Sequence, residues 1–336
     1  MRQNVLFVAI GSVLAAQAAF AGGVKTANMD LTISGGATAG YFYSANTGTS
    51  NQDNILVSDM LLEIASDTPA VGGIGVNAGL GTLEMVTVMD GGVAGHPKSM
   101  NMAVQYGYLT AMPQKDLSIM VGILPTNVGQ EAAPSFKNPH ITIAGLWGSQ
   151  PVYYPGVRAT YALGHTSVYA EVNNDAGMGS SSAWAVGAMG MAGDVNYMAS
   201  YYDTDGGRNI VDLIASGKVA GMAVGANFDF FTLDSNAKMA NKDDSAFGLA
   251  LYAAPKVGQI DVPVRVEFLN DGSSGLIGGI DSGYTFTVTP TMAMGKNAFV
   301  RAELSYVMSD AKIFMDKDGM GQDTKTSVAL QVGYKF

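Results

Sequence analysis

The 336-residue sequence contains no cysteine, and this absence excludes a disulfide framework and all thiol chemistry. Charged residues make up only 14% of the chain, and 28 acidic residues face 18 lysines and arginines. The resulting net charge of −10 argues against a nucleic-acid partner, which needs a basic face. After the first residues, no segment reaches the roughly 18 consecutive apolar residues that a membrane-spanning helix requires. These absences leave a weakly charged chain with 43 glycines and a mean hydropathy of +0.18.

Residues suited to catalysis or metal binding are also scarce. The three histidines, His96, His140 and His165, belong to no catalytic arrangement, and no phosphate-binding loop or nucleophile elbow is present. We therefore expect no enzymatic activity, no cofactor and no metal site. The stretches "DTDGG" (203–207) and "DKDGMGQD" (316–323) place carboxylates two residues apart, as calcium loops do, but neither completes the EF-hand spacing. Calcium binding and ordinary Asp-Gly turns are the two interpretations, and the turns are the simpler one.

The N-terminus has the pattern of a cleaved secretory signal peptide. Arg2 supplies the positive charge, residues 5–16 form an apolar segment, and Ala19-Phe20-Ala21 is a small-x-small cleavage site. A buried N-terminal helix is the alternative. The pattern predicts a leader over residues 1–21 and a single domain over 22–336.

The C-terminus ends on a strictly alternating segment, "SVALQVGYKF" (327–336). Val328, Leu330, Val332, Tyr334 and Phe336 lie on one face, and the intervening residues form a mixed face. Strand side chains alternate with a period of two, so this segment predicts a β-strand. Because chain ends are usually frayed and polar, we expect this end to lie within ordered structure.

The same alternation recurs along the chain and predicts sixteen strands, while helical periodicity is nearly absent after residue 22. The connections alternate between tight turns, such as 67–70, 113–115, 192–194 and 217–219, and long polar loops, such as 45–53, 88–100, 128–151 and 309–324. The predicted strands are 29–44, 54–67, 71–87, 101–112, 116–127, 152–163, 166–175, 182–192, 194–203, 209–217, 219–232, 245–255, 259–270, 281–290, 296–308 and 325–336.

This pattern is typical of an outer-membrane barrel, which has an even number of strands, short turns at one end and long loops at the other. A closed barrel also pairs every backbone group within lipid. A soluble β-sandwich would show the same alternation with its apolar face turned inward. The leader, the even strand number and the loop asymmetry favour an all-β, transmembrane, antiparallel up-and-down barrel of about 16 strands, with 14–18 possible.

Two stretches resemble known families. The final strand, with Phe336 last and Tyr334 two before it, resembles the C-terminal signal that barrel-assembly machinery reads in Gram-negative outer-membrane proteins. Residues 121–163, "VGILPTNVGQEAAPSFKNPHITIAGLWGSQPVYYPGVRATYAL", together with "YAEVNND" (169–175), resemble the family of OmpL-like β-barrel porins. The matching positions are Gly122, Pro125, Thr126, Gly129, Glu131, Pro151, Tyr154, Gly156, Val157, Arg158 and Tyr161.

The resemblance implies an outer-membrane channel for passive diffusion of small hydrophilic solutes or ions. The acidic balance adds an expectation of weak cation preference, and porins of this size often form homotrimers. Lipid, lipopolysaccharide and the assembly machinery are the other expected partners, with the long loops outside the cell. Two alternatives remain: a non-conducting surface-interaction barrel with acidic loops, filled by inward side chains such as Trp184, Met198 and Tyr202, or a channel specific for a sugar or an anion.

The charged residues of the strands fall on the polar faces, and we expect them to line the lumen. An arginine on the lipid face near the membrane midplane costs about 2–4 kcal/mol, which favours the inward orientation. Such residues set pore selectivity through rings of charge, or they brace the inner wall as a lattice of ion pairs. The predicted pore-lining residues are Glu63, Arg158, Glu171, Arg265, Glu267, Arg301, Glu303 and Lys335.

The connection 128–151 is the longest and least polar of the predicted loops, and Trp147 within it is unsuited to open water. Long loops of this kind are usually functional or disordered. We expect the loop to fold into the lumen as a constriction, with capping of the rim or packing on a neighbouring protomer as alternatives. Lys137 and His140 on it are interpreted as rim residues.

Overall fold

The computed structural model describes residues 22–25, 30–50, 52–92, 102–174, 183–204, 207–238 and 242–336, with backbone alone for 22–25. The predicted leader over 1–21 lies outside the described residues, as do parts of several long loops. Within the described ranges, no helix is long and apolar enough to span a membrane.

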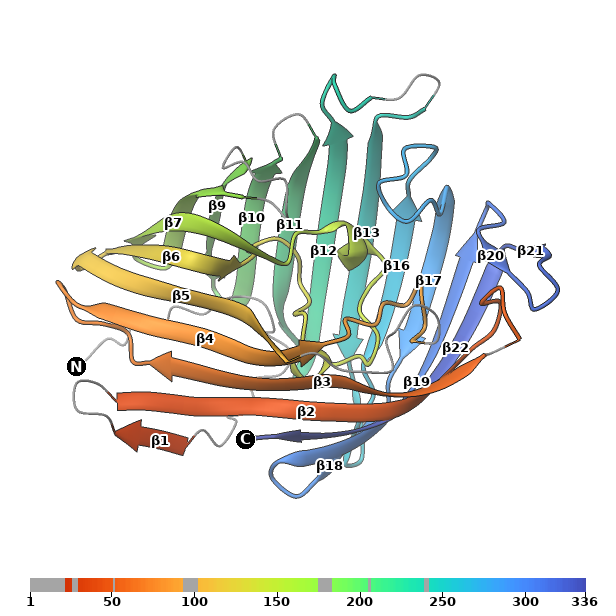
Figure 1. The fold of residues 1–336 in the computed structure, drawn as a ribbon, viewed down its shortest axis with the longest axis horizontal. Helices are drawn as coiled ribbons and strands as arrows, with labels where there is room; N and C mark the ends of the chain where they lie inside the picture. Colours follow the sequence, from red (N-terminus) through yellow and green to blue (C-terminus); the bar gives the residue numbers. More distant parts are fainter. Residues whose placement is uncertain are drawn as a thin grey trace.

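Sixteen antiparallel strands form a closed barrel, which confirms the predicted fold class and strand number (Figure 1). The ring closes where the last strand pairs with the first long one, from Gly36 with Lys335 to Ser44 with Ser327. The sixteen are β2 Asp30–Ser44, β3 Asp53–Ser66, β4 Ile74–Leu83, β5 Ala103–Gln114, β6 Leu117–Pro125, β7 Tyr153–Leu163, β8 Thr166–Asn173, β9 Ala183–Ala192, β10 Val195–Asp203, β11 Arg208–Val219, β12 Met222–Leu233, β13 Ser245–Ala254, β16 Val264–Asn270, β17 Ser282–Val288, β19 Ala298–Ser309 and β22 Thr324–Lys335.

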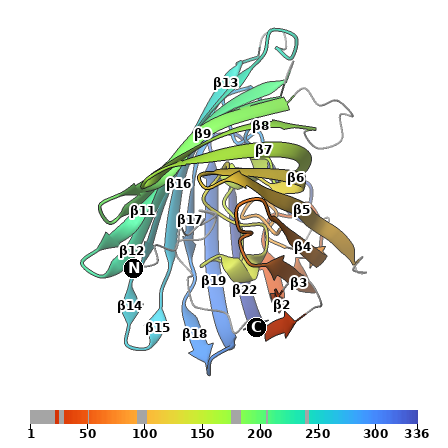
Figure 2. The same cartoon turned by 90° about the vertical axis from the view of Figure 1, so that its left-hand side faces the viewer.

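Short strands complete the ladder at one end of the barrel and in one loop. Figure 2 shows β14, β15 and β18 together at the end where the C-terminus lies. We call this the short-turn end, and the opposite end the long-loop end. The short strands are β1 Gly22–Lys25, β14 Lys256–Val257, β15 Ile260–Asp261, β18 Thr291–Met294, β20 Phe314–Met315 and β21 Gly321–Gln322, and two 3-10 helices, η1 Ser135–Lys137 and η2 Leu146–Ser149, lie between β6 and β7.

The apolar faces of the strands point outward. On β22, Leu330 and Val332 are 54% and 58% exposed, whereas Gln331 between them is 1% exposed. A soluble sandwich would reverse this arrangement, because its apolar residues would fill the core. An apolar exterior around a polar interior is the arrangement that suits a barrel in lipid.

The C-terminal residue is paired, as expected from the alternation of the last segment. The amide of Phe336 donates to the carbonyl of Gly35 at 3.0 Å, and the amide of Gly35 donates back to Phe336 at 2.9 Å. β1 pairs with the same edge of β2 just beyond this point, from Gly22 with Ile33 to Lys25 with Asp30. The last residue is therefore part of the barrel closure.

Three local sequence predictions need correction. The turn expected at 217–219 lies at Ala220–Gly221, where φ is 50° and 82°, as a two-residue hairpin turn of type I′ requires. The strand expected over 71–87 spans only Ile74–Leu83, and residues 84–92 turn into the barrel. Trp184 points outward and is 38% exposed, because the pairing of β9 places Ala183 and Ala185 on the inner face instead.

Candidate functional site

The connection between β6 and β7, residues 126–152, runs inside the barrel (Figures 1 and 2). We call it the inner loop. Its apolar residues Ile141, Ile143 and Leu146 are each 1% exposed, which explains how a loop of this composition avoids water. Residues 84–92 support it, since Val88 and Val86 exchange backbone hydrogen bonds with Ile143, each of 2.8 Å.

Carboxylates of the barrel wall hold the inner loop by accepting hydrogen bonds from its backbone amides. The pairs of acceptor and donor, with N–O distances of 2.6–3.1 Å, are Asp59 with Ser135, Glu267 with Gly145 and Leu146, and Glu303 with Ile141 and Thr142. Hydrogen bonds to an ionised acceptor are stronger than neutral ones. The backbone amides of the loop therefore compensate the negative charge of three buried acids. Glu267 and Glu303 were predicted to face the lumen, whereas Asp59 was not among the predicted residues.

Wall arginines hold the same loop from the donor side. Arg265 Nη1 donates to Glu131 Oε1 at 2.7 Å and to the carbonyl of Thr142 at 2.9 Å. Arg301 Nη1 donates to the carbonyl of Asn138 at 2.9 Å. Both guanidinium groups are almost completely buried. They act as structural anchors in this geometry and do not face open space.

Two wall glycines allow the loop to approach closely. A Cβ on Gly36 of β2 would lie 2.8 Å from the ring of Phe136, and one on Gly248 of β13 would lie 2.5 Å from Leu146. The loop thus packs its two large apolar side chains on bare backbone, at positions where other residues would displace them.

The two stems of the inner loop meet at β11 and β12. Gln150 Nε2 donates to Asp229 at 2.6 Å, and the amide of Gln130 donates to Asn227 Oδ1 at 3.2 Å. Asn227 also donates to Asp212, which lies directly across the ladder from Asp229. The stems are therefore tied to each other through one polar cluster on the wall.

His140 lies deep in the lumen, so its interpretation as a rim residue is wrong. It is 1% exposed, and its Nδ1 lies 2.8 Å from Thr289 Oγ1. Burial, together with the positive charges of Arg265 and Arg301, holds the pKa of the His140 imidazole well below its usual value. Burial also raises the pKa of the Glu131 carboxyl, although Arg265 beside it acts in the opposite direction.

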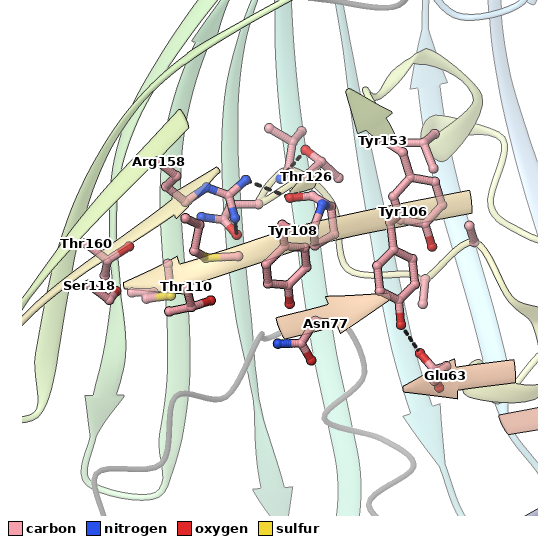
Figure 3. A pocket seen from close by; sticks show the side chains of 18 of the residues that line it. Glu63, Asn77, Tyr106, Tyr108, Thr110, Ser118, Thr126, Tyr153, Arg158 and Thr160 are labelled. Carbon is pink, nitrogen blue, oxygen red and sulfur yellow. Dashed lines mark hydrogen bonds between the residues drawn. The ribbon is translucent and has the colours of Figure 1, made fainter. Parts of the chain in front are cut away.

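On the opposite side of the inner loop lies a cavity of about 510 Å³ (Figure 3). Its far boundary is the inner face of β4 to β7, and the side chains of Glu63, Met189 and Met198 extend it onto neighbouring strands. The loop contributes Lys137 and Trp147. The lumen space is thus confined between the loop and one part of the barrel wall.

Three tyrosines dominate this wall, which we call the tyrosine wall (the inner face of β4 to β7). The rings of Tyr106 and Tyr153 stack at 5.6 Å between centroids with an angle of 27°, and Tyr108 lies 6.2 Å from Tyr106. A Cβ on Gly79 of β4 would lie 2.3 Å from the Tyr106 ring, so the glycine provides the space for that ring. Sequence reasoning missed these residues, although the alternation "YGY" (106–108) on a predicted strand signals two rings on one face.

Among the described residues, most charged groups that line the cavity have ionic partners, and the exception is Asp67 in the exposed turn between β3 and β4. Glu63 forms an ion pair with Lys137 and accepts a hydrogen bond from Tyr106 (Figure 3). Arg158 pairs with Glu171 and donates to Asn127 Oδ1 at 3.0 Å. The cavity therefore contains charges of both signs that are largely compensated.

The predicted site residues divide into separate groups. Those that line the cavity are Glu63, Arg158, Lys137 and Trp147, and Glu171 lies behind Arg158. Those between the barrel wall and the inner loop are Arg265, Glu267, Arg301, Glu303 and His140. Lys335 lies on the inner face at the short-turn end, 5.4 Å from the Phe299 ring, and Tyr334 and Phe336 lie at the barrel closure. The sequence placed the charged strand residues on inward faces but did not separate these groups.

The described residues contain no group of three or more potential metal ligands among histidine, cysteine, aspartate and glutamate. Of the two aspartate stretches, 203–207 lies partly outside the described residues. In the other, Asp316 accepts hydrogen bonds from the amides of Asp318 and Met320 at 3.0 and 2.9 Å, which is turn geometry.

Comparison with known proteins identifies the class. The family model described as "Putative beta-barrel porin-2, OmpL-like" matches residues 30–336, and the chain belongs to this family of outer-membrane porins. No curated protein matches the chain.

Several solved outer-membrane proteins share the fold. The outer-membrane channel DcaP of Acinetobacter baumannii aligns with a TM-score of 0.64 at 14% identity, covering 94% of this chain and 99% of DcaP. OmpT of Vibrio cholerae aligns with a TM-score of 0.61 at 10% identity, covering 93% and 99%. A variant of the Rh. blastica porin aligns with a TM-score of 0.55 at 14% identity, covering 91% and 100%. At such identities the similarity concerns the fold, which is that of outer-membrane channels.

Proposed function

We propose that this porin-family barrel is a diffusion channel for small hydrophilic solutes, which pass between the inner loop and the tyrosine wall. The observation that carries the proposal is the cavity of about 510 Å³ that remains beside a loop bonded to the opposite wall. A sixteen-stranded barrel is wide enough for an aqueous channel, and an inserted loop narrows it. In this proposal the inner loop is the constriction.

The remaining features extend the proposal. The long loops face the cell exterior among lipopolysaccharide, and residues 1–21 are removed on export. The assembly machinery recognises Tyr334 and Phe336. The barrels associate as homotrimers. We attribute the weak cation preference to an excess of acidic over basic residues at the cavity, which is lined by Glu63, Asp67 and Glu131 but only by Lys137 and Arg158 of opposite charge. The preference is weak because all of these except Asp67 have ionic partners.

The test is conductance of the purified, refolded protein in a planar bilayer under a salt gradient. We expect discrete steps, with a reversal potential slightly on the cation-selective side. A folded, heat-modifiable barrel without conductance contradicts the channel, and a reversal potential on the anion side contradicts the preference.

A non-conducting barrel is the second candidate, and one observation favours it. Toward the long-loop end, inward residues Tyr202, Ile210 and Phe231 are at most 1% exposed and pack in one apolar cluster with Leu146 and Ile280. This cluster fills part of the lumen that a wide channel leaves open. The same conductance measurement separates the two candidates.

A further inference from the structure

The cavity beside the tyrosine wall offers ring faces and neutral polar groups more than free charge. The rings of Tyr106, Tyr108, Tyr153 and Trp147 and four methionines line it. Its volume of about 510 Å³ falls within the ~300–1,000 Å³ of small-molecule binding pockets. The cavity is therefore large enough to hold a solute as well as to pass one.

Several neutral polar groups at the cavity have unused hydrogen-bonding capacity. Among the residues that the structure describes, the hydroxyls of Tyr108 and Tyr153 and the amide of Asn77 have no hydrogen-bond partner. The Nδ2 atom of Asn127 is buried and also lacks one. The hydroxyls of Tyr108 and Tyr153 and the amide of Asn77 are accessible from the cavity, so they can form hydrogen bonds with a ligand that supplies hydroxyls in place of water.

The charged groups do not favour a charged ligand. Arg158 is occupied by Glu171, Asn127 and the carbonyl of Pro125, the last at 2.6 Å. Glu63 is occupied by Lys137 and Tyr106. The unpaired Asp67 lies in the exposed turn between β3 and β4, so an ion next to the tyrosine wall would lose water without gaining a free counter-charge there.

We infer that the cavity is a binding site for an uncharged saccharide, an inference that rests on the proposed channel and specifies its solute. A sugar ring presents an apolar face of C–H groups for Tyr106, Tyr153 or Trp147, and hydroxyls for Tyr108 and Asn77. An apolar aromatic solute would satisfy the rings but leave the neutral polar groups unbonded. A saccharide satisfies both sets of groups.

The chain supplies its own reporter of binding, because one of its two tryptophans lines the cavity and the other points outward. In a Trp184→Phe variant, the emission comes from Trp147 alone. We expect maltose to change this emission saturably, with half-saturation on the order of millimolar, the range of a weak transport site. Glucuronate, a charged sugar, is expected to bind roughly tenfold more weakly.

Variants in the Trp184→Phe background test the residues. Tyr153→Leu removes a ring and is expected to weaken maltose binding roughly tenfold. Tyr108→Phe removes only a hydroxyl and is expected to weaken it several-fold. Tyr161→Phe is the matched control, because Tyr161 points outward and is 40% exposed. Heat-modifiable migration in gels confirms that each variant folds.

Fluorescence and conductance together separate the inference from the proposed channel. Saturable maltose binding that Tyr153→Leu weakens supports the site, whether or not the barrel conducts. Conductance without saturable binding overturns the saccharide site and leaves the channel intact. The inference is also overturned if glucuronate binds as tightly as maltose, or if the Tyr153→Leu variant binds maltose as tightly as its Trp184→Phe parent. A fluorescence response to phenol but not to maltose overturns it as well.

Discussion

The lumen has two walls of opposite character. The charged wall, formed by the inner faces of β2, β3, β16, β17, β19 and β22, presents acids and arginines, and nearly all of them bind the inner loop. The tyrosine wall presents rings, methionines and neutral polar groups, and it borders the cavity. The comparison shows that charge facing the lumen need not face open space. In this barrel it positions the loop, whereas the cavity lies against the other wall.

The largest effect is expected from Arg265→Gln on the charged wall. The change leaves Glu131 and Glu267 buried without their ionic partner, which typically costs about 3–5 kcal/mol. We expect the inner loop to leave its position, so that single-channel conductance rises and becomes noisy. Bilayer recording and urea unfolding measure both effects.

Arg158→Gln on the tyrosine wall is the comparison variant, since Arg158 is also buried and paired. It should leave the loop in place, because the main contacts of the loop lie on the charged wall. An equal rise of conductance in both variants would show that the charged wall does not hold the inner loop more strongly than the tyrosine wall does.

A smaller effect is expected from Gly36→Ala, which tests the packing of the loop without changing charge. The new Cβ would lie 2.8 Å from the Phe136 ring, and overpacking of this kind costs about 1–3 kcal/mol. We expect a lower midpoint in urea unfolding and an increase in conductance. Gly225→Ala is the matched control, because its Cβ would meet only ordinary contacts, the nearest at 3.6 Å. Equal effects of the two variants would contradict the close-packing argument.

Acidification is expected to weaken the attachment of the loop through His140. Because the pKa of buried His140 is lowered, an unfolded or displaced loop binds a proton below the usual histidine pKa of about 6.5 while the attached loop does not. The attached state therefore loses stability as pH falls below that value, by at most about 1.4 kcal/mol per pH unit. Above that pH, the contribution of His140 to the stability of the attached loop is constant.

Glu131 acts in the opposite direction, because its raised pKa favours proton uptake by the attached state. The His140→Gln variant isolates the histidine contribution. Urea midpoints measured from pH 7 to pH 5 should fall more steeply for the unsubstituted protein than for the variant. Parallel pH profiles would refute the role of His140.

The smallest effect is expected at the boundary of the two walls, where Lys137 of the loop pairs with Glu63. Partly exposed pairs contribute only about 0–1 kcal/mol, so neither Lys137→Gln nor Glu63→Gln should destabilise the barrel measurably. The reversal potential under a salt gradient should shift toward cations for Lys137→Gln and toward anions for Glu63→Gln. Shifts of the same sign would place this pair outside the ion path.

The strands were predictable because side-chain alternation is a local property. The faces of β22 agree with the pattern of residues 327–336, and the expected strand number is correct. The errors occur where local patterns are ambiguous. In β9, "AWAVGAMGMA", both faces are apolar, so only its pairing with β8 and β10 shows that Trp184 points outward. The turn at Ala220–Gly221 was missed because alanine rarely marks a positive φ.

Alternation was sufficient to predict strands with one apolar and one polar face, because a side-chain period of two follows from the backbone of a strand. The even strand number and the alternation of short and long connections then favoured a barrel with its apolar faces outward. Which inward residues face open space depends on how the barrel folds around its inner loop. That division depends on contacts between distant residues, such as Glu303 with Ile141, which are 162 positions apart. No local pattern encodes such a pairing, since it arises only when the barrel closes around its own loop.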